Sequence, residues 1–324
     1  MRQISKKIIL AVLLSVCLSV AASAALPATL IPGGNTIGLQ LQSDGVSIVE
    51  FTGDNPTAKA AGLRRGDRIH AVDGKDIWSA QQLSEAVQEH GGTPMTLTVE
   101  RDGALRSVTI APQQTEDGWR LGMYVRDSIT GIGTVTYYEA ETGRFGALGH
   151  GVNDGSSETL LPIRSGTVLP SQVVAVTKGK AGDPGALQGA LRSRSTLGVI
   201  EKNTAYGIFG TVQQIGTRKA VPVASGSEVH VGAATILSNV DGTAVREYSI
   251  RICAVDHNQA QGRNLLLEVT DGTLLKQTGG IVQGMSGSPI LQDGKLVGAV
   301  THVLVNNPVQ GYGICIENML DAAA

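Results

Sequence analysis

Ser286 stands in the segment of this 324-residue chain that most clearly predicts chemistry, Gly284-Met-Ser-Gly-Ser-Pro289. A serine between glycines can sit on a tight turn with its hydroxyl exposed, because glycine needs no clearance for a Cβ atom. Successive N–H groups of such a turn can converge on one point and stabilise an oxyanion. The pattern therefore predicts a serine nucleophile, although an ordinary β-turn between strands has the same composition.

Two further segments supply companions for this serine. Gly146-Ala-Leu-Gly-His150-Gly places a histidine between glycines at the end of an apolar strand, where it can act as a general base. Val297-Gly-Ala-Val-Thr-His302 predicts a strand that flanks the substrate, so Thr301 and His302 are expected to contact it. His302 also competes with His150 for the role of base.

Neither a metal nor another cofactor is predicted. His150 and Asp154 lie close in the sequence, but no third ligand stands at a usual spacing, and Asn153-Asp154-Gly155 is typical of a turn. Cys253 and Cys315 are too few for a disulfide scaffold, and one bridge and two free thiols both remain open. The net charge of −2 and the lack of a long basic run exclude nucleic acid as a partner.

The elements that must position these residues are expected to be mainly β. The chain has 42 glycines, only 3% aromatic residues and 17% charged residues. This composition, with many β-branched residues, suits short strands joined by tight turns and argues against a helical bundle. Over residues 127–324, strand patterns separated by turn signals predict an all-β domain, a barrel or a sandwich.

A smaller α/β domain is predicted in front of it, over residues 35–112. Its pattern gives strands at 46–51 and 68–72, a helix to His90 capped by Ser79, and a hairpin turned at Asp102-Gly103. Residues 113–126 predict a linker between the two domains.

Residues 1–24 predict a secretory signal. Basic residues precede an apolar run at 8–20, and small residues follow it at Ala22-Ser-Ala24. An uncleaved anchor is the alternative, because the apolar stretch is close to the shortest that spans a membrane. The protein is therefore expected to be exported across the cytoplasmic membrane, with at most a transient anchor.

The segment Ala61-Gly-Leu-Arg-Arg-Gly-Asp-Arg-Ile-His-Ala-Val-Asp-Gly74 resembles the PDZ family. In that family a peptide adds as a strand beside a loop whose N–H groups hold a terminal carboxylate. The resemblance implies that residues 37–41 form this loop, with Gly38, Leu39 and Leu41 binding the peptide.

The order of His150 before Ser286 resembles chymotrypsin-like serine peptidases, and more closely the stage IV sporulation protein B (SpoIVB) peptidases of endospore-forming bacteria. The segments that carry the resemblance are Thr130-Gly-Ile-Gly-Thr134, Phe145-Gly-Ala-Leu-Gly-His150, Gly207-Ile-Phe-Gly210, Thr278-Gly-Gly-Ile-Val-Gln-Gly-Met-Ser-Gly-Ser-Pro-Ile290, Gly298-Ala-Val-Thr-His-Val303 and Gly311-Tyr-Gly313. The resemblance implies a double barrel in which Ser286 is the nucleophile and His150 the base. It also implies that the N–H groups of Gly284 and Ser286 form the oxyanion hole.

The same resemblance implies that Asp271 completes a catalytic triad. Asp271 lies much closer to the serine in sequence than the acid of chymotrypsin-like folds usually does, and Asp271-Gly272 also has the composition of a hairpin turn. Asp256 and Asp241 are the alternatives.

A role in sporulation is implied by the resemblance alone. Such enzymes are secreted by the forespore into the space between its two membranes. There they cleave a membrane-embedded regulator, which frees an intramembrane metalloprotease to activate a late sigma factor. They also cut their own N-terminal region, here expected at residues 25–34, a segment that the PDZ-like groove could hold. The alternatives are a non-catalytic PDZ adaptor and a structural protein of the spore envelope.

Overall fold

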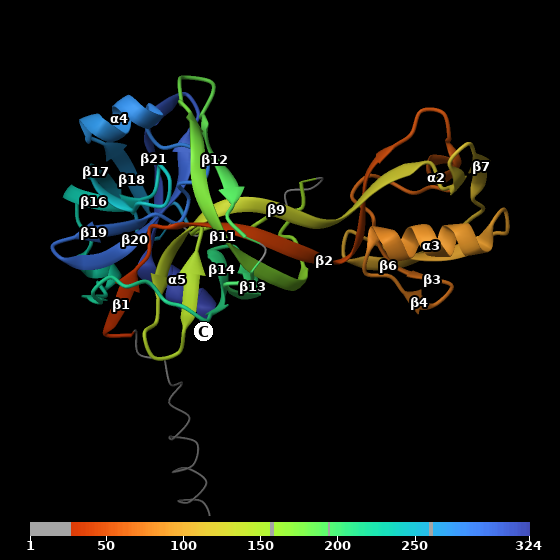
Figure 1. Ribbon diagram of the computed structural model, residues 1–324, viewed down its shortest axis with the longest axis horizontal. Helices are drawn as coiled ribbons and strands as arrows, with labels where there is room; N and C mark the ends of the chain where they lie inside the picture. Colours follow the sequence, from red (N-terminus) through yellow and green to blue (C-terminus); the bar gives the residue numbers. More distant parts are fainter. Residues whose placement is uncertain (1–26, 156–158, 194, 259–261) are drawn as a thin grey trace, which may run out of the picture.

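The computed structural model describes residues 27–155, 159–193, 195–258 and 262–324, so the predicted signal at 1–24 lies outside the described residues (Figure 1). The strands are β1 Thr29–Pro32, β2 Thr36–Phe51, β3 Arg68–Val72, β4 Lys75–Asp76, β5 Met95–Arg101, β6 Ala104–Ile110, β7 Gln113–Thr115, β8 Gly118–Arg120, β9 Met123–Tyr138, β10 Arg144–Ala147, β11 Ile163–Thr177, β12 Ala186–Leu191, β13 Gly198–Thr204, β14 Gly207–Val212, β15 Val221–Pro222, β16 Gly232–Ser238, β17 Arg246–Val255, β18 Leu265–Val269, β19 Pro289–Gln292, β20 Lys295–Leu304 and β21 Asn307–Cys315. The helices are α2 Thr57–Ala60, α3 Ala80–His90, the 3₁₀ turn η1 Gly226–Glu228, α4 Gly272–Thr278 and α5 Ile316–Ala323.

The C-terminal half forms a closed antiparallel barrel in the order β16-β17-β18-β21-β20-β19. Alternate residues of its strands point inward, as a period of two requires, and bury side chains such as Ile236, Ile250 and Leu267. Met285, next to the predicted nucleophile, is fully buried in the same core. The turn that carries Ser286 is therefore fixed to this barrel by an apolar side chain.

We call the C-terminal barrel the second barrel, because the first barrel precedes it in the chain. The first barrel lies beside it and has the strand order β2-β9-β10-β14-β13-β11, with pairing between β2 and β9 closing the ring. Its core includes Leu39, Leu41, Phe145, Val168 and Ile208. Two six-stranded antiparallel barrels side by side are the architecture that the family resemblance implies, and the chain is mainly β as the composition predicts.

The PDZ-like domain is inserted into the first barrel through two long strands, β2 and β9, which connect the two lobes in Figure 1. In β2, residues 37–43 pair with β11 of the barrel, whereas Val46 and Ser47 pair with β3 of the PDZ-like domain. In β9, residues 123–126 pair with the PDZ-like part of β2, and residues 128–134 pair with its barrel part. The two domains therefore share a continuous two-stranded connection.

The PDZ-like domain has the local structure that its residues predict. Ser79 caps α3 by accepting the N–H of Gln82 at 3.1 Å, and Asp102 and Gly103 both adopt positive φ in the hairpin turn.

Residues 113–126 differ from the expected linker. They form the β7–β8 hairpin and the start of β9, because Trp119, Leu121 and Met123 pack into the core of the domain. Among the described residues, no helix is both long and apolar enough to cross a membrane.

Candidate active site

The turn from Gly284 to Ser288 holds Ser286 in a fixed position. Gly284 and Gly287 have φ values of +96° and +94°, a conformation that L side chains rarely adopt. A Cβ atom on Gly287 would lie 2.0 Å from the carbonyl oxygen of Thr134, so only glycine allows the turn to pack against β9. The structure of the turn thus requires glycine at both positions, as the sequence pattern predicts.

Strand β9 of the first barrel holds this turn, because Thr134 and Thr136 of the strand donate hydrogen bonds to carbonyl oxygens of the turn. The Thr134 N–H donates to the carbonyl oxygen of Ser286 at 3.0 Å, and the Thr134 hydroxyl donates to that of Gly284 at 2.8 Å. The Thr136 hydroxyl donates to the carbonyl oxygen of Gly287, also at 2.8 Å. These two threonines were not predicted as site residues, because their role depends on contacts between barrels that the sequence does not display.

The N–H groups of Gly284 and Ser286 have no hydrogen-bond partner in the part of the chain that the structure describes, whereas those of Met285, Gly287 and Ser288 all donate to backbone carbonyls. Unpaired backbone donors beside a nucleophile are the groups that stabilise an oxyanion. The geometry is thus consistent with the oxyanion hole implied for Gly284 and Ser286.

His150 follows β10 at the end of a strained segment. Leu148 and Gly149 both have φ near +70°, which is unusual for a leucine, and such strain clusters at functional sites. His150 Nδ1 lies 2.8 Å from the carbonyl oxygen of Gly151. Because a carbonyl can only accept, Nδ1 must carry the proton, which leaves Nε2 with a free lone pair. Burial lowers the pKa of His150, so the ring is neutral and can accept a proton at neutral pH.

His302 packs directly against His150, with the two ring centroids 4.9 Å apart. Burial lowers the pKa of His302 to about 4, and repulsion from Arg263, and from His150 when His150 is protonated, adds to the shift. Its Nδ1 is buried, and it has no hydrogen-bond partner among the described residues. His302 is therefore a neutral ring that contacts His150, but it is not among the described residues that line the cavity of Ser286 and His150.

Ser286 and His150 line one cavity of about 280 Å³. The Ser286 hydroxyl donates to the carbonyl oxygen of Thr301 at 2.7 Å, so in this state it is not directed at His150. Catalytic hydrogen bonds often form only with substrate present, so this geometry does not exclude a pair of Ser286 and His150. Thr301 contributes this carbonyl, while its own side chain is buried.

The Asp271 carboxylate does not contact His150. Its Oδ1 accepts the N–H groups of Thr273 and Leu274, each at 2.9 Å, which makes it the N-cap of α4 at the outer end of the second barrel (Figure 1). Asp271 neither lines the cavity that Ser286 and His150 share nor contributes to the pKa shift of His150. The expected triad role of Asp271 is thereby corrected to that of a helix cap.

The other candidate acids and the cysteines also lie outside the site. The Asp256 carboxylate accepts the N–H of Asn258 in an exposed turn, and Asp241 is exposed in the turn after β16. Cys253 and Cys315 are free thiols, and burial raises the pKa of Cys315 to about 11. In the described part of the chain, the group that orients His150 is the carbonyl of Gly151 rather than a carboxylate.

The peptide-binding residues expected in the PDZ-like domain, Gly38, Leu39 and Leu41, lie instead inside the first barrel. This part of β2 pairs with β11 on one edge and with β9 on the other. A strand with both edges paired cannot accept a further strand. The expectation for these three residues is therefore wrong.

A groove of the expected kind lies between α3 and the start of β9. Leu83, Ser84 and Val87 of α3 face Met123 and Val125 across a cavity of about 180 Å³. In the described residues, this part of β9 pairs only with β2 and leaves its other edge open. Gly122, directly before the strand, has a φ of +79°. The signal that could have located the groove is the segment Leu121-Gly-Met-Tyr-Val125, an apolar-glycine-apolar turn that leads into a strand.

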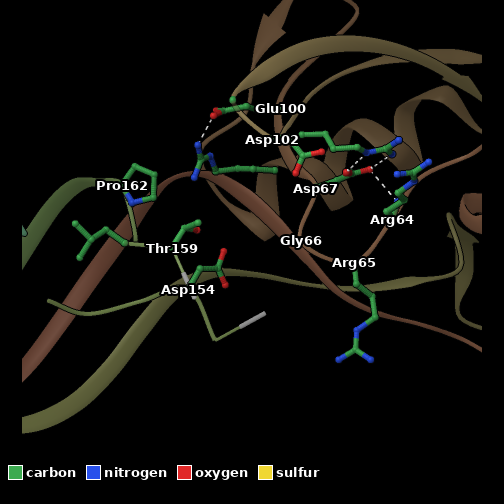
Figure 2. Close-up of a pocket in the computed structure, with 13 residues that line it drawn as sticks. Arg64, Arg65, Gly66, Asp67, Glu100, Asp102, Asp154, Thr159 and Pro162 are labelled. Carbon is green, nitrogen blue, oxygen red and sulfur yellow. Dashed lines mark hydrogen bonds and ion pairs between the residues drawn. The ribbon is translucent and has the colours of Figure 1, made fainter. Parts of the chain in front are cut away.

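A larger cavity of about 440 Å³ lies where the PDZ-like domain faces the first barrel, and Figure 2 shows the residues around it. Its charged groups are largely paired: Arg68 with Glu100 and Arg101 with Asp67, both at 2.6 Å. The buried Asp154 on the other wall accepts from Arg126 at 2.9 Å. This cavity contains neither Ser286 nor His150, so we assign it to the domain junction rather than to catalysis.

Comparison with known proteins agrees with this geometry. The family model of the SpoIVB peptidase S55 matches residues 117–320, and a PDZ domain model matches residues 54–101. The chain belongs to the SpoIVB peptidase S55 family. The matched PDZ domain precedes the matched peptidase region.

Individual relatives match only parts of this S55 peptidase. Zinc metalloprotease RasP of Geobacillus kaustophilus is 34% identical over 20% of this chain and 16% of its own length. Regulator of sigma-E protease RseP of Salmonella typhimurium is 38% identical over 18% of this chain and 13% of its own length. The chain spans less than a quarter of the length of the curated relatives that it matches.

Solved structures with partial similarity to this chain include a PDZ domain and an HtrA-type protease. The PDZ domain of the SdrC-like protein from Listeria monocytogenes has 20% identity and a TM-score of 0.23, and the match covers 25% of this chain and 87% of that one. The HtrA-type protease AlgW with decapeptide has 13% identity and a TM-score of 0.36, and the match covers 62% of this chain and 53% of that one.

Proposed function

We propose that this S55 peptidase is an exported endopeptidase of endospore formation that uses Ser286 as nucleophile and His150 as general base. The observation that carries the proposal is the pair of unpartnered N–H groups on Gly284 and Ser286, in the same cavity as the neutral ring of His150. A non-catalytic adaptor would have no use for free oxyanion donors beside a serine hydroxyl.

The proposed mechanism follows from these positions. Ser286 Oγ attacks the scissile carbonyl carbon while His150 Nε2 takes the hydroxyl proton. The carbonyl oxygen becomes an oxyanion and accepts the N–H groups of Gly284 and Ser286. The carbonyl of Gly151 accepts Nδ1–H throughout and stabilises the imidazolium. His150 then returns the proton to the leaving amine, and water releases the acyl group by the same route.

By family resemblance, the proposed substrate is a membrane-embedded regulator whose cleavage frees an intramembrane metalloprotease and activates a late sigma factor. The proposed site of action is the space between the two forespore membranes. The groove between α3 and β9 would hold an extended peptide segment as an added strand, which supports a role for the PDZ domain in substrate recruitment.

Self-cleavage is proposed on the N-terminal side of Thr29. Cleavage is expected within residues 25–34, but Thr29–Pro32 form β1, which pairs with both β15 and β9. Leu30 and Ile31 are buried there, so cleavage within β1 would first require the strand to leave the sheet.

Complementation of a sporulating strain that lacks its own S55 peptidase tests this proposal. Wild-type protein should restore late sigma-factor activity, and Ser286→Ala, present at equal amount, should not. N-terminal sequencing should show an additional N-terminus before Thr29 in the wild type alone. Full complementation by Ser286→Ala would contradict the proposal and favour the adaptor.

A further inference from the structure

The cavity beside Ser286 has an almost entirely apolar wall. Apart from the catalytic groups, it is lined mainly by Leu39 and Leu41 of β2, Ile129 and Gly131 of β9, and Leu148 and Val152 near His150. No aspartate, glutamate, lysine or arginine is among the described residues that line it. A charged group that entered it would lose its hydration without gaining a partner.

Gly131 leaves part of this cavity open. Leu39 lies opposite Gly131 and Leu41 opposite Ile129 in the β2–β9 ladder, and directly opposed residues project on the same side of a sheet. A side chain at position 131 would therefore point into the cavity.

Packing within the chain does not require this glycine. A Cβ atom on Gly131 would meet nothing within 4 Å, and its φ lies outside the left-handed region. Gly133, two residues on, is different, because a Cβ atom there would lie 2.1 Å from Leu148 Cδ2. The space at Gly131 is thus left free by the absence of a side chain, and not by a backbone constraint.

We propose that this cavity is the subsite for a bulky aliphatic or aromatic side chain of the substrate, on the leaving-group side of the scissile bond. The proposal rests on the function proposed above, because Ser286 and the free N–H groups beside it fix where the scissile carbonyl lies. The cavity wall includes His150 and the three residues after it. Because His150 returns its proton to the leaving amine, the leaving half of the substrate passes this wall.

Peptide libraries randomised on either side of the cleaved bond test the proposal. The wild type should prefer Leu, Ile, Met or Phe over Gly or Asp by about tenfold or more at the first residue after the bond, since a methylene in an apolar pocket is worth roughly tenfold or more. Gly131→Leu should shift this preference to Gly and Ala, whereas Ile129→Ala, which enlarges the cavity, should shift it toward Phe and Trp.

Thr130→Leu is the matched control, because Thr130 is exposed on the other face of the same strand. It should keep the wild-type preference. A small fluorophosphonate reports whether Ser286 is still reactive in each variant, which separates a collapsed site from a filled subsite. The subsite is refuted if a wild type that can react with the phosphonate shows no preference at the residue after the bond. It is also refuted if both Gly131→Leu and Ile129→Ala keep the wild-type preference. A wild type that neither reacts with the phosphonate nor cleaves any peptide would overturn the proposed function itself.

Discussion

Thr134 donates its backbone N–H to the carbonyl oxygen of Ser286 at 3.0 Å, so a strand of the first barrel holds the nucleophile turn of the second. The same strand, β9, begins in the PDZ domain, where Met123 and Val125 line the peptide groove. Between these ends, Arg126 pairs with the buried Asp154, four residues after His150. A peptide added to the open edge of β9 would therefore contact a strand that reaches both halves of the active site.

Loss of the Thr134 hydroxyl should weaken catalysis without removing the nucleophile. Thr134→Val deletes the hydrogen bond to the Gly284 carbonyl, which helps to set the direction of the oxyanion donors. Because one such donor is worth roughly a hundredfold or more in kcat, we expect this indirect loss to lower kcat by about tenfold, with KM little changed. Steady-state kinetics on a peptide substrate measures both values, and Thr130→Val on the exposed face should behave as the wild type. An unchanged kcat in Thr134→Val would show that the turn is held without this contact.

Substitution of Asp271 should affect stability more than chemistry. Asp271→Asn keeps a capping oxygen for α4, so turnover and melting temperature should stay close to those of the wild type. Asp271→Ala should cost about 1 kcal/mol in the free energy of unfolding, because two N–H groups lose their acceptor. Chemical denaturation measures this cost. A loss of turnover by orders of magnitude in Asp271→Asn would instead return Asp271 to the catalytic triad.

The two contacting histidines predict a specific pH dependence. His150 has a lowered pKa, so the acid limb of the kcat/KM profile should have its midpoint below pH 6.5, the ordinary histidine value. His302 is neutral in the folded protein down to about pH 4, while unfolded histidine takes up a proton near pH 6.5. Protonation therefore favours the unfolded state, and the His302 contribution to stability is lost as the pH falls from 6.5 to about 4. Melting temperatures across this range should fall less steeply in His302→Phe than in the wild type. Equal slopes would contradict the neutral state of His302.

Filling the groove between α3 and β9 should abolish peptide binding by the PDZ domain. Ser84 is exposed in the groove wall, so Ser84→Trp blocks it without removing core contacts. Peptides displayed with free C-termini should bind wild type and Glu85→Trp, which alters the outer face of α3, at least about tenfold more tightly than Ser84→Trp. Equal binding to all three proteins would place the peptide elsewhere.

Local patterns predicted much of this structure, and long-range contacts account for what they missed. The cap at Ser79, the turn at Asp102-Gly103 and the glycines around Ser286 depend on neighbours in the chain, so their sequence is informative. By contrast, residues 37–41 look like a PDZ loop only if the chain order of the commonest PDZ domains is assumed. In the folded chain β2 and β9 cross between domains, and the groove is formed by Leu121–Val125 instead. The support from Thr134 likewise depends on a segment that the sequence does not mark as a neighbour of Ser286, whereas the cap at Asp271 is a local contact, to Thr273 and Leu274.

The most direct test of the account is to react the protein with a fluorophosphonate and to identify the labelled residue by peptide mass spectrometry. A single adduct on Ser286 is expected in the wild type, with no adduct in Ser286→Ala and labelling slowed by orders of magnitude in His150→Ala, because nucleophile and base act as one unit. Wild-type protein that stays unlabelled, or His150→Ala that labels at the wild-type rate, would contradict the assignment of Ser286 and His150 as the catalytic pair.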